Sequence, residues 1–271
     1  MSKYMNQGDI PTVQIYNSDV KEYKIRTSLD SILGTRKNQQ DSAFVQSEKN
    51  LTVGIVCDGM GGLNAGEVAS QMAVTQFIED FYRAEVKDIP LFMEQEIVKI
   101  DQNVFDARDE HHEKLGAGTT LVAVIIYKDQ MYCASVGDSR IYLIRNSKIH
   151  ALNRLHNYRE QLDRMLRQDM ITEAEYKKEE PKAEALTSFV GMGNLLILDV
   201  TKQPMQLKDG DVILLCSDGL YKTLSEEQMR AVVENHNIPW NLKARALTRK
   251  AEEETISKQD NTTVVLIKYN E

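Results

Sequence analysis

Cysteine is scarce in this 271-residue chain, and the cysteines present show no pairing pattern. Cys57, Cys133 and Cys216 each lie inside an apolar run, which is typical of reduced thiols in a protein core and not of a disulfide framework. No Cys-x-x-Cys or His-x-x-x-His spacing occurs, so the sequence does not predict a zinc site. We therefore expect a cytoplasmic protein with a reduced interior.

Long apolar runs and a basic surface are also missing. The longest apolar run, residues 121–127, is far too short to cross a bilayer, and residues 1–11 contain no apolar signal region. Lys and Arg are scattered among Asp and Glu, and the formal net charge is -8, so nothing resembles the basic stripe of a nucleic-acid binder. We expect no membrane segment, no nucleic-acid partner and a monomer.

No linker rich in Gly, Pro or Ser divides the chain, so residues 1–271 are expected to form a single domain. Apolar runs separated by amphipathic segments predict antiparallel strands and helices in an α+β fold. Val13 and Ile15 alternate weakly, as in an edge strand or a loose arm. Residues 151–194 are densely charged and are expected to lie on the surface. The other main expectations are helices over 65–84 and 91–113, the latter carrying His111 and His112, and strands over 121–127, 131–136 and 195–200.

Two apolar runs each end in an Asp-Gly pair. LTVGIVC leads into Asp58-Gly59, and VILLCS leads into Asp218-Gly219. A single Asp-Gly after a strand is most often a hairpin turn. Two matched pairs instead place two carboxylates at the rim of the core, where a carboxylate is costly unless it is paired. The sequence therefore predicts a cation site at this rim, with simple turn residues as the alternative.

Two further aspartates extend this pattern. Asp138 stands at a break between two expected strands, and Asp260 stands at the entry of the last strand. With Asp58 and Asp218 they make an all-oxygen ligand set, which favours magnesium, manganese or calcium over zinc, and the Gly59 carbonyl can add a neutral ligand. Without metal the carboxylates repel one another, so we expect a less stable or abnormally titrating metal-free protein.

A pair of such ions suggests hydrolytic chemistry. Two metals about 3.5–4 Å apart can lower the pKa of a shared water from 15.7 toward about 7 and so supply hydroxide at neutral pH. Arg36 is the candidate to grip phosphate oxygens, because a guanidinium binds them bidentately. Asp41 could orient Arg36 or a metal-bound water. The predicted reaction is hydrolysis of a phosphate monoester without a covalent enzyme intermediate.

Six motifs occur in a fixed order: Arg36 with Asp41, DGMGG at 58–62, GTT at 118–120, VGDSR at 136–140, CSDGL at 216–220 and QDNTT at 259–263. From about residue 23 to 268, this set resembles the bacterial branch of the metal-dependent (type 2C, PPM family) protein serine/threonine phosphatases. The resemblance implies a four-layer αββα sandwich of two stacked antiparallel sheets flanked by helices. It also implies that residues 151–194 are a flap next to the active site.

The resemblance also assigns the ligands. It implies that Asp58 bridges two Mn²⁺ or Mg²⁺ ions, that the Gly59 carbonyl binds the second, and that Asp218 and Asp260 bind the first. Asp138 is implied for a third, weaker ion. The expected partners are phosphorylated proteins, including a serine/threonine kinase and its substrates.

Two other functions compete with this one. A phosphatase-like regulatory module that binds phosphoproteins with weak or no turnover is kept open by Gln40, since the family usually has an acidic residue there. A phosphatase with an aspartyl nucleophile would need a second acid two residues after Asp58, and Met60 stands at that position. Hydrolysis of phosphoserine and phosphothreonine in proteins is the leading prediction.

Overall fold

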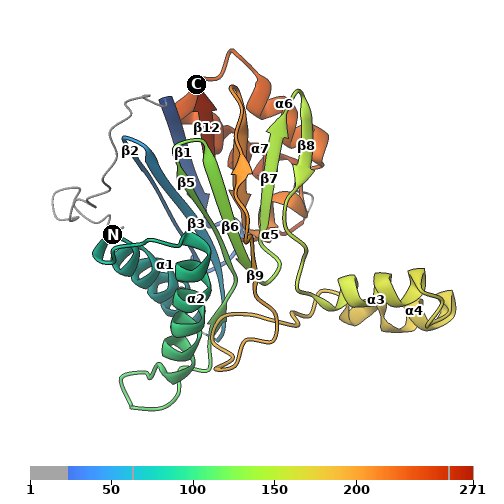
Figure 1. Cartoon of the computed structure of the whole chain (residues 1–271). Helices are drawn as coiled ribbons and strands as arrows, with labels where there is room; N and C mark the ends of the chain where they lie inside the picture. Colours follow the sequence, from blue (N-terminus) through green and yellow to red (C-terminus); the bar gives the residue numbers. More distant parts are fainter. Residues whose placement is uncertain (1–23, 63, 256, 271) are drawn as a thin grey trace.

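The computed structural model describes residues 24–62, 64–255 and 257–270, so the expected alternation at Val13 and Ile15 lies outside the described residues. Two antiparallel sheets face each other (Figure 1). The first sheet contains, in spatial order, β1 (Lys24–Ile32), β12 (Thr262–Asn270), β11 (Val212–Cys216), β7 (Arg140–Arg145) and β8 (Lys148–Ala151). The second contains β10 (Met205–Gln206), β6 (Gln130–Val136), β5 (Leu121–Tyr127), β3 (Leu51–Met60) and β2 (Asp41–Glu48), with β4 (Gly118–Thr119) paired to β3 and β9 (Asp199–Val200) paired to β6.

Alternation along the strands builds three apolar layers. In β3, Ile55 and Cys57 face the helices on the outside of the second sheet, whereas Val56 belongs to the cluster between the sheets. In β12, Val265 lies between the sheets and Leu266 faces the helices outside the first sheet. Both faces of the central strands are therefore buried, which explains why these strands read as continuous apolar runs. Each fully buried side chain of this kind contributes about 1.5–3 kcal/mol.

Helices cover both outer faces. α1 (Ala65–Arg83) and α2 (Ile89–Asp106) pack on the second sheet, and α5 (Asp218–Tyr221), α6 (Glu226–Glu234) and α7 (Lys243–Glu254) pack on the first, with the short turn η2 (Trp240–Leu242) before α7. The expected αββα arrangement of two stacked antiparallel sheets is confirmed. No helix among the described residues is long and apolar enough to cross a membrane.

Two expected elements were wrong in extent. The second helix ends at Asp106 and not at residue 113, so His111 and His112 lie in a loop. The Asp109 carboxylate accepts the backbone N–H groups of His111 and Glu113 there, at 2.9 and 3.0 Å, and such local bonds replace helical ones. The strand expected over 195–200 is reduced to β9, the two residues Asp199–Val200.

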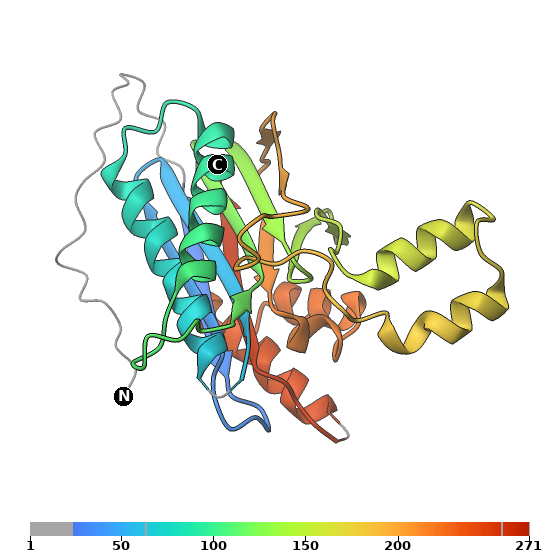
Figure 2. The same ribbon diagram turned by 90° about the horizontal axis from the view of Figure 1, so that it is seen from below.

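Residues 152–198 form an excursion from the sandwich. It contains α3 (Tyr158–Arg167), α4 (Glu173–Glu179) and the short turn η1 (Glu180–Lys182), and its two helices project away from the sheets (Figures 1 and 2). Helix α2 anchors the C-terminal end of the excursion. One Asp101 carboxylate oxygen there accepts three successive backbone N–H groups, from Gly191, Met192 and Gly193, at 2.7, 2.8 and 3.2 Å. The Gly-x-Gly turn thus wraps an internal carboxylate.

Candidate metal centre and active site

Asp58 is held at the end of β3 through its backbone. Its carbonyl accepts hydrogen bonds from the Thr120 N–H at 2.8 Å and from the Thr119 hydroxyl at 3.0 Å, and its own N–H donates to Thr120 Oγ1 at 2.9 Å. Both threonines therefore bind the main chain, and the Asp58 carboxylate is left available for other partners. This explains why a Gly-Thr-Thr turn accompanies the first Asp-Gly pair.

Asp41 lies directly opposite Asp58 in the β2–β3 register and is buried. The Ser217 hydroxyl donates to Asp41 Oδ2 at 2.7 Å, whereas the buried Asp41 Oδ1 has no hydrogen-bond partner. Burial raises the pKa of Asp41 to about 7, although the bond from Ser217 works in the other direction. A buried carboxylate oxygen without a donor is expensive, which fits a position beside a cation or an ordered water.

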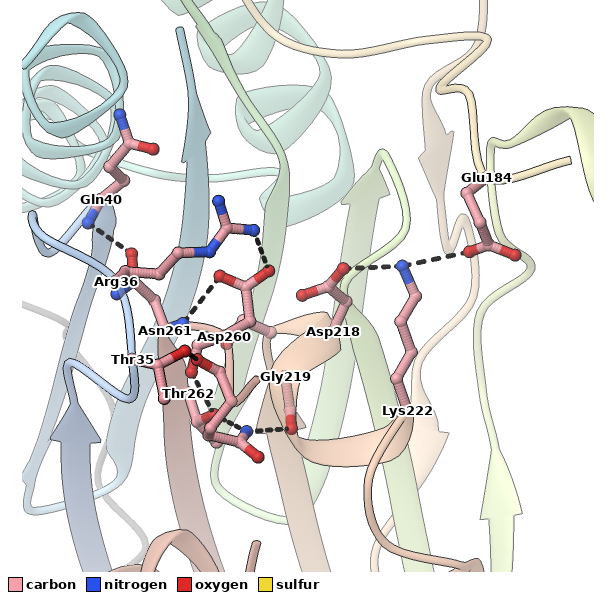
Figure 3. A network of polar contacts seen from close by, with 12 residues as sticks. Thr35, Arg36, Gln40, Glu184, Asp218, Gly219, Lys222, Asp260, Asn261 and Thr262 are labelled. Carbon is pink, nitrogen blue, oxygen red and sulfur yellow. Dashed lines mark hydrogen bonds and ion pairs between the residues drawn. The ribbon is translucent and has the colours of Figure 1, made fainter. Parts of the chain in front are cut away.

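Arg36 is paired with Asp260, which the sequence had not indicated. Its Nη2 lies 2.5 Å from Asp260 Oδ2 (Figure 3). The side-chain hydrogen bond to Asp260 is the main reason that the pKa of Arg36 is raised. The guanidinium remains mostly exposed, so it can reach a ligand at the rim.

Asp218 and Asp138 share a lysine. Asp218 opens α5 directly after β11, and Lys222 at the end of this helix places its Nζ 2.7 Å from Asp218 Oδ2 and 3.6 Å from Asp138 Oδ2. Burial lowers the pKa of Lys222, but the charges of Asp218 and Asp138 outweigh it and the pKa is raised. The ammonium therefore stays charged at neutral pH.

Glycines allow the motif loops to touch. A side chain at Gly59 would meet the Gly66 carbonyl oxygen at 2.1 Å, and one at Gly219 would meet the Asn261 carbonyl oxygen at 2.2 Å. The Asn261 amide oxygen accepts the Gln40 N–H at 2.9 Å, and the Gln40 carbonyl accepts the Gly59 N–H at 3.0 Å. Hydrogen bonds thus join the end of β3 to the loop before β2, and that loop to the loop before β12.

The five carboxylates act on one another. Burial raises the pKa of Asp58 well above its usual range, and the charges of Asp41, Asp218, Asp138 and Asp260 raise it further, in that order. Asp138, Asp218 and Asp260 therefore lie within electrostatic range of Asp58, as does Asp41, which stands opposite Asp58 in the β2–β3 register. Such a concentration of negative charge stabilises a bound cation and destabilises the site without one.

The donor set fits hard divalent cations, because it consists of oxygens only. In the part of the chain that the structure describes, no group of three or more His, Cys, Asp or Glu side chains could hold an ion as it stands. Two of the carboxylates are instead occupied by cationic side chains, Asp260 by Arg36 and Asp218 by Lys222 (Figure 3). The orphaned oxygen of Asp41 and the mutual repulsion at Asp58 show that these two cations do not neutralise the whole cluster.

Sequence reasoning missed the supporting residues. Three residues contact a candidate site residue or its loop across more than 80 residues of chain. These contacts are Lys222 with Asp138, Ser217 with Asp41, and Asn261 with Gln40. Ser217 lies inside the CSDGL motif and Asn261 inside the QDNTT motif, so the motifs could have pointed to these two residues. Lys222 follows Asp218 by four residues, the spacing at which side chains meet on a helix, but the short helix α5 was not predicted.

Known proteins resemble this chain along most of its length. A family model described as protein phosphatase 2C matches residues 31–259. The chain is 29% identical to the serine/threonine phosphatase Stp of Listeria welshimeri over 247 residues, which is 86% of this chain and 90% of that protein. It is 32% identical to the protein phosphatase PhpP of Streptococcus pneumoniae over 244 residues, which is 87% of this chain and 94% of that protein.

Solved structures share the fold. The serine/threonine phosphatase of S. agalactiae superposes with a TM-score of 0.77 at 27% identity, covering 90% of this chain and 99% of that one. The catalytic domain of the serine/threonine phosphatase PstP, solved in complex with two manganese ions, superposes with a TM-score of 0.72 at 25% identity, covering 91% of this chain and 99% of that one.

Proposed function

Because the chain belongs to the protein phosphatase 2C family and is a metal-dependent protein serine/threonine phosphatase, we propose that its aspartate cluster holds two divalent cations, Mn²⁺ or Mg²⁺. Asp58 would bridge both ions, and Asp218 and Asp260 would bind one of them. The Gly59 carbonyl would complete the other site. The observation that carries this assignment is that four other carboxylates, from both sheets, lie close enough to Asp58 to raise its pKa: Asp41, Asp138, Asp218 and Asp260.

When two ions are bound, a water between them would have its pKa lowered toward about 7 and could act as the nucleophile. The chain's own residues would position the phosphate. Arg36 is exposed and cationic at the rim, and the entry of a cation at Asp260 would free its guanidinium to bind phosphoryl oxygens bidentately. Asp41 lies beneath the cluster, where its unpaired Oδ1 could accept a proton or a hydrogen bond from water. The contacts of Arg36 support a role for Asp41 toward water and not toward Arg36.

We also propose the broader setting. The substrates would be phosphorylated proteins, among them a serine/threonine kinase and its substrates, and the enzyme would act as a monomer with residues 1–271 as one catalytic domain. Residues 151–194 would be a flap that contacts the substrate. A cytoplasmic location is supported by the three buried cysteines, none of which is in a disulfide.

Hydrolysis of a phosphothreonine peptide tests this function. Turnover should require Mn²⁺ or Mg²⁺, stop with chelator, and fall at least about 100-fold in the Asp218→Asn variant, because that change removes a ligand charge but little volume. Asp209→Asn, at a surface turn away from the cluster, is the matched control and should keep full activity. Manganese binding without turnover would instead support the regulatory phosphoprotein-binding module.

A further inference from the structure

Lys222 occupies the outer end of the aspartate cluster. Its ammonium lies 2.7 Å from Asp218 and, on its other side, 3.1 Å from Glu184 (Figure 3). It also lies 3.6 Å from Asp138. These acids come from three separate places in the chain: the start of α5, the turn between β6 and β7, and the returning arm of the excursion. A single lysine therefore connects both sheets and the excursion.

The contacts leave little room for another cation at Asp138. Asp138 is buried, and Lys222 is the cationic side chain found beside its carboxylate among the described residues. Lys222 faces Oδ2 of Asp218 and Oδ2 of Asp138, so a divalent ion held by these two oxygens would lie within a few ångströms of the ammonium, and like charges at that range repel strongly. The other Asp218 oxygen points away from Lys222 and is left for the proposed two-ion centre (Figure 3). The third, weaker ion implied at Asp138 by the family resemblance thus does not fit this arrangement.

The same lysine holds the excursion. Glu184 accepts from Lys222. It also accepts from Nη2 and Nε of Arg159, at the start of α3, at 2.9 and 3.0 Å. The chain of contacts therefore runs from Asp218 through Lys222 and Glu184 to the first projecting helix. Displacing the ammonium would release this link.

We propose that Lys222 is the resident cation at Asp138, so that the centre takes two divalent ions and the ammonium stands where a third would bind. This inference rests on the proposed metal centre and adds a positioning residue to it. Lys222 is hydrogen-bonded to Asp218, forms a longer ion pair with Asp138, and couples both to Glu184. Occupancy by a tethered side chain does not depend on the concentration of free metal.

Counting bound manganese by titration calorimetry tests the proposal without measuring activity. Wild type should bind two ions per chain, and Lys222→Met, which keeps the length but removes the charge, should bind three. The extra ion should disappear again in Lys222→Met combined with Asp138→Asn. Glu184→Gln, which leaves the ammonium beside both aspartates, is the matched control and should bind two.

The outcomes separate this inference from the proposed function. No manganese binding by wild type would reject the metal centre itself. Three ions in wild type that become two in Asp138→Asn would keep the metal centre but reject the role of Lys222, and this arm does not depend on the lysine variant folding. A folded Lys222→Met protein that still binds two ions would also reject it.

Discussion

At Gly59 the backbone passes so close to the start of α1 that no side chain fits. An added Cβ would lie 2.1 Å from the Gly66 carbonyl oxygen and 2.6 Å from the Gln40 carbonyl oxygen. Both obstacles are backbone atoms, so relief requires the loop or the helix to move. The glycine therefore keeps the candidate bridging aspartate next to its neighbouring loop.

We expect Gly59→Ala to destabilise the protein by about 3 kcal/mol, because it overpacks a site bounded by main chain. Gly62→Ala is the control three residues later, where an added Cβ meets nothing within 4 Å. That variant should change the free energy of unfolding by less than about 1 kcal/mol. Denaturant unfolding of both variants would contradict this account if their stabilities were equal.

At the scale of the elements, α1 and α2 enclose a buried acid far from the candidate site. The Glu96 carboxylate accepts from Gln76 at 2.8 Å and lies 3.6 Å from the Lys99 ammonium. Burial and a hydrogen bond with Asp80, partly countered by Gln76, raise the pKa of Glu96 to about 7. The protonated form is therefore favoured in the folded state.

The raised pKa of Glu96 predicts how the free energy of unfolding changes with pH. Between about pH 4.5 and pH 7 the folded state holds a proton on Glu96 that the unfolded state has lost, so this group reduces stability as pH rises. Glu96→Gln should remove about 2 kcal/mol of that loss, and its advantage over wild type should be larger at pH 8 than at pH 5. Glu94→Gln, on the exposed side of α2, is the control. A pH-independent difference between Glu96→Gln and wild type in urea melts would argue against the shift.

The elements also show what the sequence could predict and what it could not. Strand β3, which carries Asp58 near its end, and strand β11, which stops two residues before Asp218, were predictable, because both faces of each strand are buried and the apolar run is continuous. The capping boxes at Thr172 and Ser225 follow from local spacing, because Glu175 and Gln228 stand three residues after them. The end of α2 at Asp106 was not, since the side chain of Asp109 decides it.

The candidate site, like the elements, was predictable only in part. Its aspartates stand at strand ends, and strand ends follow from local pattern. Their partners do not, because the pairs Arg36–Asp260 and Ser217–Asp41 join residues 224 and 176 positions apart. Only the folded sandwich brings such residues together, so the sequence predicted the candidate ligands without these hydrogen-bond and ion-pair partners.

At the scale of the whole molecule, folding concentrates the negative charge of five aspartates at one end of the sandwich. The free energy of unfolding should therefore rise when a cation binds. At free manganese about 100 times its dissociation constant, the gain is about 2.7 kcal/mol. For a domain of this size that corresponds to a rise of roughly 5–10 °C in Tm.

Differential scanning calorimetry with manganese, with magnesium and with chelator checks this expectation. The rise in Tm should be lost in a variant that combines Asp58→Asn with Asp218→Asn, because the main ligand charges are then absent. Equal thermal midpoints with and without metal in wild type would mean that the cluster is not a cation site.

Anomalous diffraction from crystals grown with manganese tests the account most directly, since it locates the ions independently of activity. The account predicts two peaks, with the Asp58 carboxylate between them, Asp218 and Asp260 on one, and the Gly59 carbonyl on the other. Peaks elsewhere, or a site at which Asp58 contacts no ion, would contradict it.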